Sequence, residues 1–192
     1  MVKEPRPGRV KTRLARDIGA VPAAWWYRHQ VRALLRRLED PRWRLVLAVA
    51  PDGARRSTVW PAALPRWPQG GGDLGARMAR MLRRAAPGPA CLIGSDIPGV
   101  RRTHVAQAFA ALGRTDAVFG PAPDGGYWLI GLKAPHRPPP GFLRGVRWSS
   151  AEALGDSRAT LGRARIVEVE TLADVDTAAD LPTPPARATS RG

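Results

Sequence analysis

The chain has 192 residues, of which 44% are hydrophobic and 24% charged, a balance typical of a globular protein. This length falls within the usual range for one domain and is enough to enclose a core. No apolar run approaches the roughly 18 residues that cross a bilayer, and the first 14 residues hold no apolar stretch typical of signal peptides. We expect a cytoplasmic protein with one domain over residues 1–181 and a disordered, proline-rich tail over residues 182–192.

The formal net charge is +15, because 31 lysines and arginines outnumber 16 aspartates and glutamates. Such a charge attracts nucleic acid through counterion release. However, all but three of the basic residues are arginine, and the chain also has 20 glycines and 20 prolines, a composition typical of genome-wide codon bias. The arginines are spread along the chain without an interleaved aromatic pattern. We therefore expect no nucleic-acid partner.

Helices and strands alternate in the first half of the chain. Apolar residues recur at nearly helical spacing over residues 22–39, which predicts an amphipathic helix. Residues 44–50 (RLVLAVA) are a nearly continuous apolar run, which predicts a strand buried on both faces. Residues 60–72 are rich in proline and glycine and predict a loop. A second helix is predicted over residues 74–82, with Asp73 near its start.

The alternation continues after a second buried strand at residues 89–93. The remaining predicted elements are a helix over residues 103–112, strands over residues 116–119 and 127–132, a helix over residues 149–161 and a strand over residues 165–169. This order indicates an α/β fold with a mostly parallel sheet covered on both faces. Such folds bind ligands outside the carboxyl ends of their strands, where the polar motifs of this chain lie.

The basic segment KEPRPGRVKTRL, residues 3–14, is a candidate phosphate site. Gly8 allows the backbone to approach a ligand closely, and Arg9, Lys11 and Arg13 place cations beside it. This combination suits the diphosphate or triphosphate of a nucleotide. The alternative is a solvated basic arm.

Two aspartates are candidate metal ligands. Asp96 follows a predicted buried strand within GSDIP, where a carboxylate is well placed to hold Mg²⁺ or Mn²⁺ on phosphate oxygens. Ser95 and Asp96 are equally good N-caps for the helix that follows. Asp176, in DVDTAADL, could likewise be a metal ligand or a helix cap, since Asp176 and Thr177 could cap a short helix. Sequence spacing leaves both interpretations open.

A third polar segment is GPAPDGGYWLIGL, residues 120–132. Its two glycines after Asp124 permit a close approach to a ligand, and Tyr127 and Trp128 offer flat faces of the kind that bind sugars. A hairpin with an Asp-Gly turn and aromatic side chains in the core explains the same residues, most strongly Trp128. Asp124 and Tyr127 remain the site candidates. The histidines lie outside any nucleophile motif, and Gly70-Gly71-Gly72 lacks the Lys-Ser/Thr ending of a P-loop.

In their order along the chain, six segments resemble the bacterial rSAM/selenodomain-associated transferase 1 family, which is glycosyltransferase-like. They are PRPGRVKTRL (5–14), GGDLGARM (71–78), IGSDIP (93–98), GPAPDGGYWLIGL (120–132), WSS (148–150) and DVDTAADL (174–181). The resemblance covers nearly the whole chain. It implies the GT-A fold of nucleotide-diphospho-sugar transferases, a three-layer α/β/α sandwich around a mostly parallel mixed sheet.

The same resemblance implies roles for individual residues. The nucleotide phosphates would meet Gly8, Arg9, Lys11 and Arg13. A divalent metal, Mg²⁺ or Mn²⁺, would bind Asp96 and Asp176. The acceptor or sugar pocket would be lined by Asp124, Gly125, Gly126 and Tyr127, with Trp148 and Ser149 nearby. Lys11, Asp96 and Asp124 are the candidate catalytic residues.

One feature departs from the family pattern. Its members begin with an apolar strand in the centre of the sheet, whereas this chain opens at Met1-Val2-Lys3, so the first strand is expected to be missing. Loss of a central strand exposes two edges, at a cost comparable to a whole domain stability of about 5–15 kcal/mol. A misplaced start codon or a compromised chain would each explain the difference.

The sequence thus predicts a metal-dependent transferase that binds a nucleotide-activated sugar and a small acceptor. Nucleotidyl transfer from a nucleoside triphosphate to a small phosphorylated acceptor is the alternative within the same fold. A basic, noncatalytic nucleic-acid-binding protein and a degenerate nucleotide-binding module are hypotheses of other classes. The oligomeric state cannot be predicted from these features.

Overall fold

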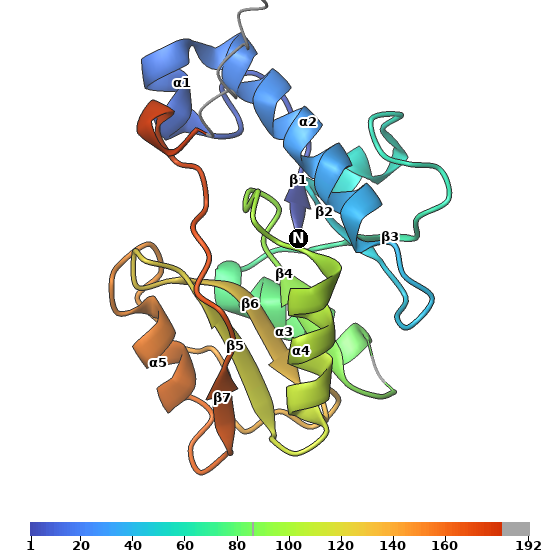
Figure 1. The fold of residues 1–192 in the computed structure, drawn as a ribbon, viewed down its shortest axis with the longest axis vertical. Coiled ribbons are helices and arrows are strands. Elements are labelled where there is room, and N and C mark those ends of the chain that lie inside the picture. Colours follow the sequence, from blue (N-terminus) through green and yellow to red (C-terminus); the bar gives the residue numbers. More distant parts are fainter. Residues whose placement is uncertain (86, 182–192) are drawn as a thin grey trace, which may run out of the picture.

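The protein is described by a computed structural model that covers residues 1–85 and 87–181, so the predicted disordered tail lies outside the described residues. Strands and helices alternate as the sequence predicts (Figure 1). The helices are α1 (Thr12–Ile18), α2 (Ala20–Leu38), α3 (Leu74–Arg84), α4 (Arg102–Leu112) and α5 (Ala153–Ala159). Short 3-10 turns lie at Asp52–Arg56 and Ala178–Asp180. Among the described residues, none of the helices has the length and apolar character of a transmembrane span.

The strands form two sheets. The first contains β1 (Val2–Lys3), β2 (Leu47–Ala50) and β3 (Arg66–Pro68), which are all parallel. The second has the order β4-β6-β5-β7, with β4 at Ala90–Ile93, β5 at Ala117–Pro121, β6 at Tyr127–Leu132 and β7 at Ile166–Glu168. In it β6 runs antiparallel to β4 and β5, whereas β5 and β7 are parallel. The predicted α/β class, with a mixed sheet flanked by helices, is confirmed.

The prediction that the first strand is missing is wrong. Val2 and Lys3 pair with β2, and the side chain of Val2 is buried. Two residues reach only about 7 Å, however, so β1 forms a short ladder. The α-amino group of Met1 donates to the carbonyl of Ile93 at the end of β4, 2.6 Å away. β1 therefore joins two sheets where one continuous sheet was expected.

Helices cover both faces of the second sheet, because alternate side chains of a strand point to opposite faces. Phe119 and Ile130 pack against α3 and α5 on one face. Val118 and Leu129 pack against α4 and the second half of α2 on the other. The first sheet packs on α2 through a separate cluster that includes Val2. Two elements were not predicted. α1 is short and rich in arginine, and β3 contains a proline in a segment without apolar alternation, so neither has a clear sequence pattern.

Cys91 lies on β4 and gives a simple test of this packing. Burial raises the pKa of its thiol to about 12, so the reactive thiolate is scarce at neutral pH. At pH 8.5 we expect iodoacetamide to modify Cys91 roughly a thousandfold more slowly than an unhindered thiol with a pKa of about 8.5. Mass spectrometry should show complete modification only in denaturant. Rapid modification of the folded protein would contradict the described position of β4.

Candidate functional site

The loops that follow the parallel strands meet at one edge of the fold. Lys11 follows β1, Asp52 follows β2 and Gly70 follows β3. Asp96 follows β4, and Asp124 follows β5. After β7 the chain returns toward α1 in an extended segment that carries Asp174 and Asp176 (Figure 1). Polar groups from both sheets are thereby collected where α/β folds bind their ligands.

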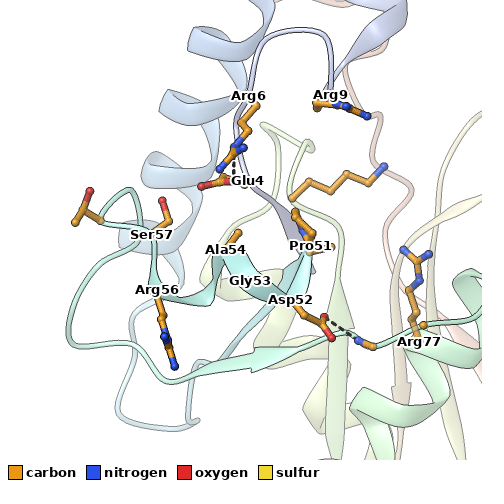
Figure 2. A pocket seen from close by; sticks show the side chains of 15 residues that line it. Glu4, Arg6, Arg9, Pro51, Asp52, Gly53, Ala54, Arg56, Ser57 and Arg77 are labelled. Carbon is orange, nitrogen blue, oxygen red and sulfur yellow. Dashed lines mark hydrogen bonds and ion pairs between the residues drawn. The ribbon is translucent and has the colours of Figure 1, made fainter.

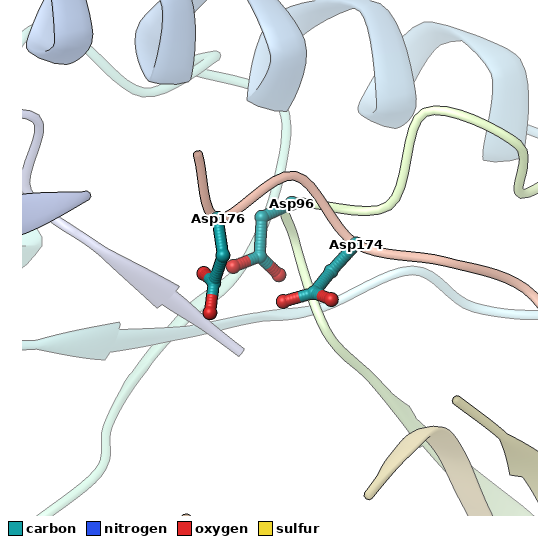
Figure 3. A group of neighbouring side chains, drawn as sticks. All are labelled: Asp96, Asp174 and Asp176. Atoms are coloured by element: carbon teal, nitrogen blue, oxygen red, sulfur yellow. The ribbon is translucent and has the colours of Figure 1, made fainter. Parts of the chain in front are cut away.

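Three carboxylates lie together at this edge. Figure 3 shows Asp96, Asp174 and Asp176 with their side chains turned toward one another. One oxygen from each lies within 4.8 Å of the others, and all three residues are half-buried. Carboxylate oxygens at this separation fit a single Mg²⁺ or Mn²⁺, whose oxygen ligands lie about 2.1 Å from the metal. The cluster is therefore chemically suited to a divalent metal.

The ammonium group of Lys11 lies among these carboxylates. Its Nζ is 2.5 Å from Asp96 Oδ2, 2.9 Å from Asp176 Oδ1 and 3.9 Å from Asp174 Oδ2. Only 7% of the Lys11 side chain is exposed, and its backbone is left-handed at φ 46°. Arg13 is largely exposed and pairs with Asp176 at 2.7 Å. In this structure a lysine supplies the positive charge that the carboxylates require.

The electrostatics of the cluster differ between its members. Burial, reinforced by the charges of Asp176 and Asp96, raises the pKa of Asp174 to about 6. Burial also opposes ionisation of Asp176, but hydrogen bonds and charge from Lys11 and Arg13 hold the pKa of that carboxyl below its usual value. For Lys11, burial is outweighed by Asp96 and Asp176, and the pKa of the ammonium is raised. Lys11 is therefore protonated, and Asp174 is the carboxylate least compensated by it.

Asp174 was not among the residues predicted from the sequence. Val175 is buried against Leu14 and Ala23, so the side chains on either side of it in this extended segment point the opposite way, toward Asp96. The amide of Val175 also donates to the carbonyl of Asp96, 3.2 Å away. The Asp-Val-Asp alternation was the available signal.

The capping alternatives can now be compared with the observed helix starts. α4 begins at Arg102 with Arg101 as its N-cap, so Asp96 caps no helix. The short turn at Ala178–Asp180 is capped by Thr177, with Asp180 accepting from the amide of Thr177. Neither Asp96 nor Asp176 is engaged as a cap.

The loop that carries Asp96 is tied to the rest of the fold by Tyr27 of α2. The Tyr27 hydroxyl accepts from the amide of Lys3 at 3.1 Å and lies 2.7 Å from Ser95 Oγ. Both Tyr27 and Ser95 are buried. This contact fixes β1, α2 and the Asp96 loop relative to one another.

A large cleft of about 1130 Å³ lies at the carboxyl ends of β1, β2 and β3 (Figure 2). Two acidic residues line it, and both have partners: Glu4 lies 2.6 Å from Arg6, and Asp52 accepts from the amide of Gly70 at 3.0 Å. Its five basic residues are Lys3, Arg6, Arg9, Arg56 and Arg77. The cleft is thus electropositive and suited to phosphate groups.

The basic residues of segment 3–14, predicted to bind phosphate, are divided between the large cleft and the carboxylate cluster. Arg9 lines the large cleft, as expected, whereas Lys11 and Arg13 contact the carboxylates. Gly8 occupies a turn with φ 72°, which favours glycine. Arg56 and Arg77 were not predicted, because arginines are so frequent in this chain that their positions carry little information.

A smaller pocket of about 190 Å³ lies on the other side of α3. Its lining includes most of the residues that the resemblance implied for a sugar or acceptor: Asp124, Gly126, Tyr127, Trp148 and Ser149. Asp96 and Asp174 also line it, so it opens on the carboxylate cluster. Trp128 is buried and donates from Nε1 to the carbonyl of Glu170, which agrees with its predicted place in the core.

Gly125 supports this pocket from behind and is not part of its lining. Its φ is 82°, and its carbonyl accepts from the amide of Leu154 at 2.9 Å. A Cβ at this position would collide with the backbone of Ala151. We therefore expect Gly125→Ala to lower the free energy of unfolding by about 2–4 kcal/mol. Urea denaturation should show this loss, whereas Gly155→Ala, at a helical position with open space around it, should be neutral or stabilising.

Solved structures resemble the fold of this chain. A protein from Desulfovibrio desulfuricans G20, provisionally described as a nucleotide-diphospho-sugar transferase, is 32% identical, with a TM-score of 0.78 over 92% of this chain and 80% of the other. Its likeness agrees with the predicted GT-A-like fold. Rv0371c from Mycobacterium tuberculosis H37Rv is 18% identical, with a TM-score of 0.51 over 80% of each chain. Its homologue from Mycobacterium sp. strain JC1 is 16% identical, with a TM-score of 0.50 over 80% of this chain and 78% of the other, and these two share the fold alone.

The comparison with sequence families identifies one family. No curated protein matches the chain significantly. Residues 33–150 match the model of the family DUF2064, which is described as an uncharacterized protein conserved in bacteria. These residues contain Asp96 and the small pocket up to Ser150, and they make up more than half of the chain. The protein belongs to the DUF2064 family.

Proposed function

We propose that the protein is a metal-dependent glycosyltransferase, which passes a sugar from a nucleotide-activated donor to a small acceptor. The observation that carries the proposal is the carboxylate cluster of Asp96, Asp174 and Asp176, two members of which line a small aromatic pocket, in a fold that also has an electropositive cleft. The likeness to the Desulfovibrio protein supports a nucleotide-sugar donor. The six sequence motifs support the finer assignment, within DUF2064, to the rSAM/selenodomain-associated transferase 1 family.

The large cleft is the proposed nucleotide site. Arg6, Arg9 and Arg77 line it and provide donors that match phosphate oxygens. Asp52, Gly70 and Gly71 also line the cleft, and a base and ribose would lie against them. The phosphate chain would then extend from this cleft to the carboxylate cluster. A divalent metal held there by Asp96, Asp174 and Asp176 would neutralise the charge that develops on the leaving diphosphate.

The sugar is proposed to enter the small pocket with the acceptor. Transfer breaks the bond between the anomeric carbon and the phosphate oxygen, and the electron pair leaves with the nucleoside diphosphate. A hydroxyl oxygen of the acceptor forms the new bond, and its proton passes to a carboxylate base. Asp124 is the candidate, since it lines the pocket and the amide of Gly126 fixes its Oδ1 at 2.9 Å.

Lys11 is proposed to bind the carboxylates when no metal is present and a donor phosphate when a metal is bound. Without metal its ammonium compensates the carboxylates, as in this structure. When a metal takes that place, Nζ would turn to a phosphate oxygen of the donor. Arg13 would likewise turn from Asp176 to a phosphate oxygen of the donor.

Nucleotidyl transfer is the second candidate, because five basic residues in the large cleft would also suit a nucleoside triphosphate. Calorimetric titration with UDP-sugars, GDP-sugars, GTP and CTP, each with and without Mg²⁺, separates the two. Sugar transfer predicts metal-dependent binding of a nucleotide-sugar and release of a nucleoside diphosphate. Release of pyrophosphate from a triphosphate would support the alternative. No binding of any nucleotide would refute both.

A further inference from the structure

Charge is divided unevenly between the two cavities. The large cleft has five basic residues and two acidic ones, whereas Asp96, Asp124 and Asp174 are the charged residues among the described residues that line the small pocket. Both cavities are at the same edge of the fold, and Asp96 connects the small pocket with the cluster. A phosphate group therefore finds matching charge in the large cleft. In the small pocket Lys11, or a metal at the cluster, compensates Asp96 and Asp174, so the charge that opposes a phosphate there is that of Asp124, which has no ion pair among the described residues.

Helix α3 separates the two cavities. Arg77 faces the large cleft, while Leu74 and Met78 line the small pocket. The guanidinium of Arg77 is held on the cleft side because its Nε donates to the carbonyl of Gly72 at 2.9 Å. Arg77, which precedes Met78 in the sequence, thus directs its charge to the large cleft.

Aromatic side chains line the small pocket. The indole Nε1 of Trp148 is buried and has no partner among the described residues. Trp148 lies edge-on to Tyr127, with their ring centroids 6.5 Å apart, while the Tyr127 hydroxyl is engaged with Ser157 Oγ at 3.1 Å. Aromatic faces, with nearby carboxylates as acceptors, suit hydroxyl groups.

We infer that the small pocket binds a small alcohol that carries no negative charge, such as a polyol or a monosaccharide, and that it rejects phosphate esters of the same compounds. This inference deepens the proposed function and rests on it for the transfer step, in which the alcohol oxygen bonds to the anomeric carbon. It separates sugar transfer from nucleotidyl transfer, because the latter needs an acceptor phosphate in this pocket. Binding itself requires no donor and is testable alone.

The test uses the full chain labelled with 5-fluorotryptophan, in the presence of Mg²⁺. The fluorine resonance of Trp148, assigned by its loss in Trp148→Phe, reports binding in the small pocket and is insensitive to phosphate bound only in the large cleft. The probes are glucosamine, glucose and glucose 6-phosphate, together with glycerol and glycerol 3-phosphate. We expect each neutral probe to bind at least tenfold more tightly than its phosphate ester, and glucosamine to bind at least as tightly as glucose.

A matched pair of variants tests the cause. Asp124→Asn keeps an oxygen that accepts from the amide of Gly126 but removes the charge. It should reduce the ratio of the affinities for glucose and glucose 6-phosphate, called here the affinity gap, by roughly threefold to tenfold. Asp116→Asn removes a charge at the opposite end of β5, where Asp116 accepts from the amide of Arg165, and should leave the affinity gap unchanged. Equal or tighter binding of the phosphate esters would overturn the inference, as would a Trp148 resonance that responds to no neutral probe.

The outcomes distinguish this inference from the proposed function. If nucleotides fail to bind in calorimetry but neutral alcohols shift the Trp148 resonance, the donor assignment fails and the pocket assignment stands. If a nucleotide-sugar binds with Mg²⁺ and the phosphate esters are preferred, the inference alone fails.

Discussion

Asp96→Asn is expected to lower the affinity for a nucleotide-sugar in the presence of Mg²⁺ by at least about 100-fold, because it removes a charged ligand from the carboxylate cluster. Lys11 retains its contact with Asp176 in this variant, so the fold should persist. Calorimetric titration measures the loss, and circular dichroism checks the fold.

A matched control is Asp73→Asn. Asp73 caps α3 by accepting from the amide of Ala76 at 2.7 Å, and asparagine caps helices equally well. Removal of this charge, which lies outside the cluster, should change nucleotide affinity by less than about threefold. Similar losses in both variants would mean that Asp96 acts through the general charge of the protein, and the metal assignment would be wrong.

Lys11→Met is expected to make the stability of the protein depend on metal. The variant leaves three half-buried carboxylates without their ammonium partner. Loss of one partner from a fully buried pair is unfavourable by about 3–5 kcal/mol, but solvent screens these carboxylates, and roughly 1–2 kcal/mol is expected. The melting temperature should fall by about 2–8 °C and recover when MgCl₂ is added.

The same variant should affect metal and nucleotide in opposite directions. Without Lys11 in competition, Mn²⁺ alone should bind roughly tenfold more tightly, whereas the nucleotide-sugar should bind more weakly because a phosphate contact is lost. Lys133→Met is the control, since Lys133 is exposed and its Nζ lies 3.3 Å from the carbonyl of Gly113. A Lys11→Met protein that is as stable as the parent without metal, and that gains nothing from metal, would contradict this role.

The sequence predicted the larger elements of the fold well. Over residues 22–39 and 103–112, apolar periodicity extended over several turns, so α2 and α4 were found with ends within two residues of those observed. The short elements could not be found in this way. β3 has three residues including Pro68, and its place in the sheet depends on a long-range pairing with β2 that no local pattern encodes.

The candidate site was predictable in part. The position of Asp96 followed from the rule that α/β folds bind ligands at strand ends, and the small pocket followed from the resemblance through Asp124 and Tyr127. Neither source revealed that Lys11 lies among the carboxylates. Lys11 and Asp176 are 165 residues apart, and their contact depends on the return of the chain after β7. Asp174 was not predicted because its orientation depends on the burial of the neighbouring Val175 against Leu14 and Ala23, which are distant in the sequence.

The central claim is that Asp96, Asp174 and Asp176 hold a divalent metal at the edge of the small pocket. The most direct measurement is a crystal structure of the protein with MnCl₂ and UDP or GDP, with data collected at the manganese absorption edge. We expect one anomalous peak about 2.1 Å from an oxygen of each of these carboxylates, with Lys11 Nζ displaced toward the nucleotide phosphates. A cluster without a manganese peak, in which Lys11 keeps its contacts with Asp96 and Asp176 while a nucleotide is bound, would contradict the claim.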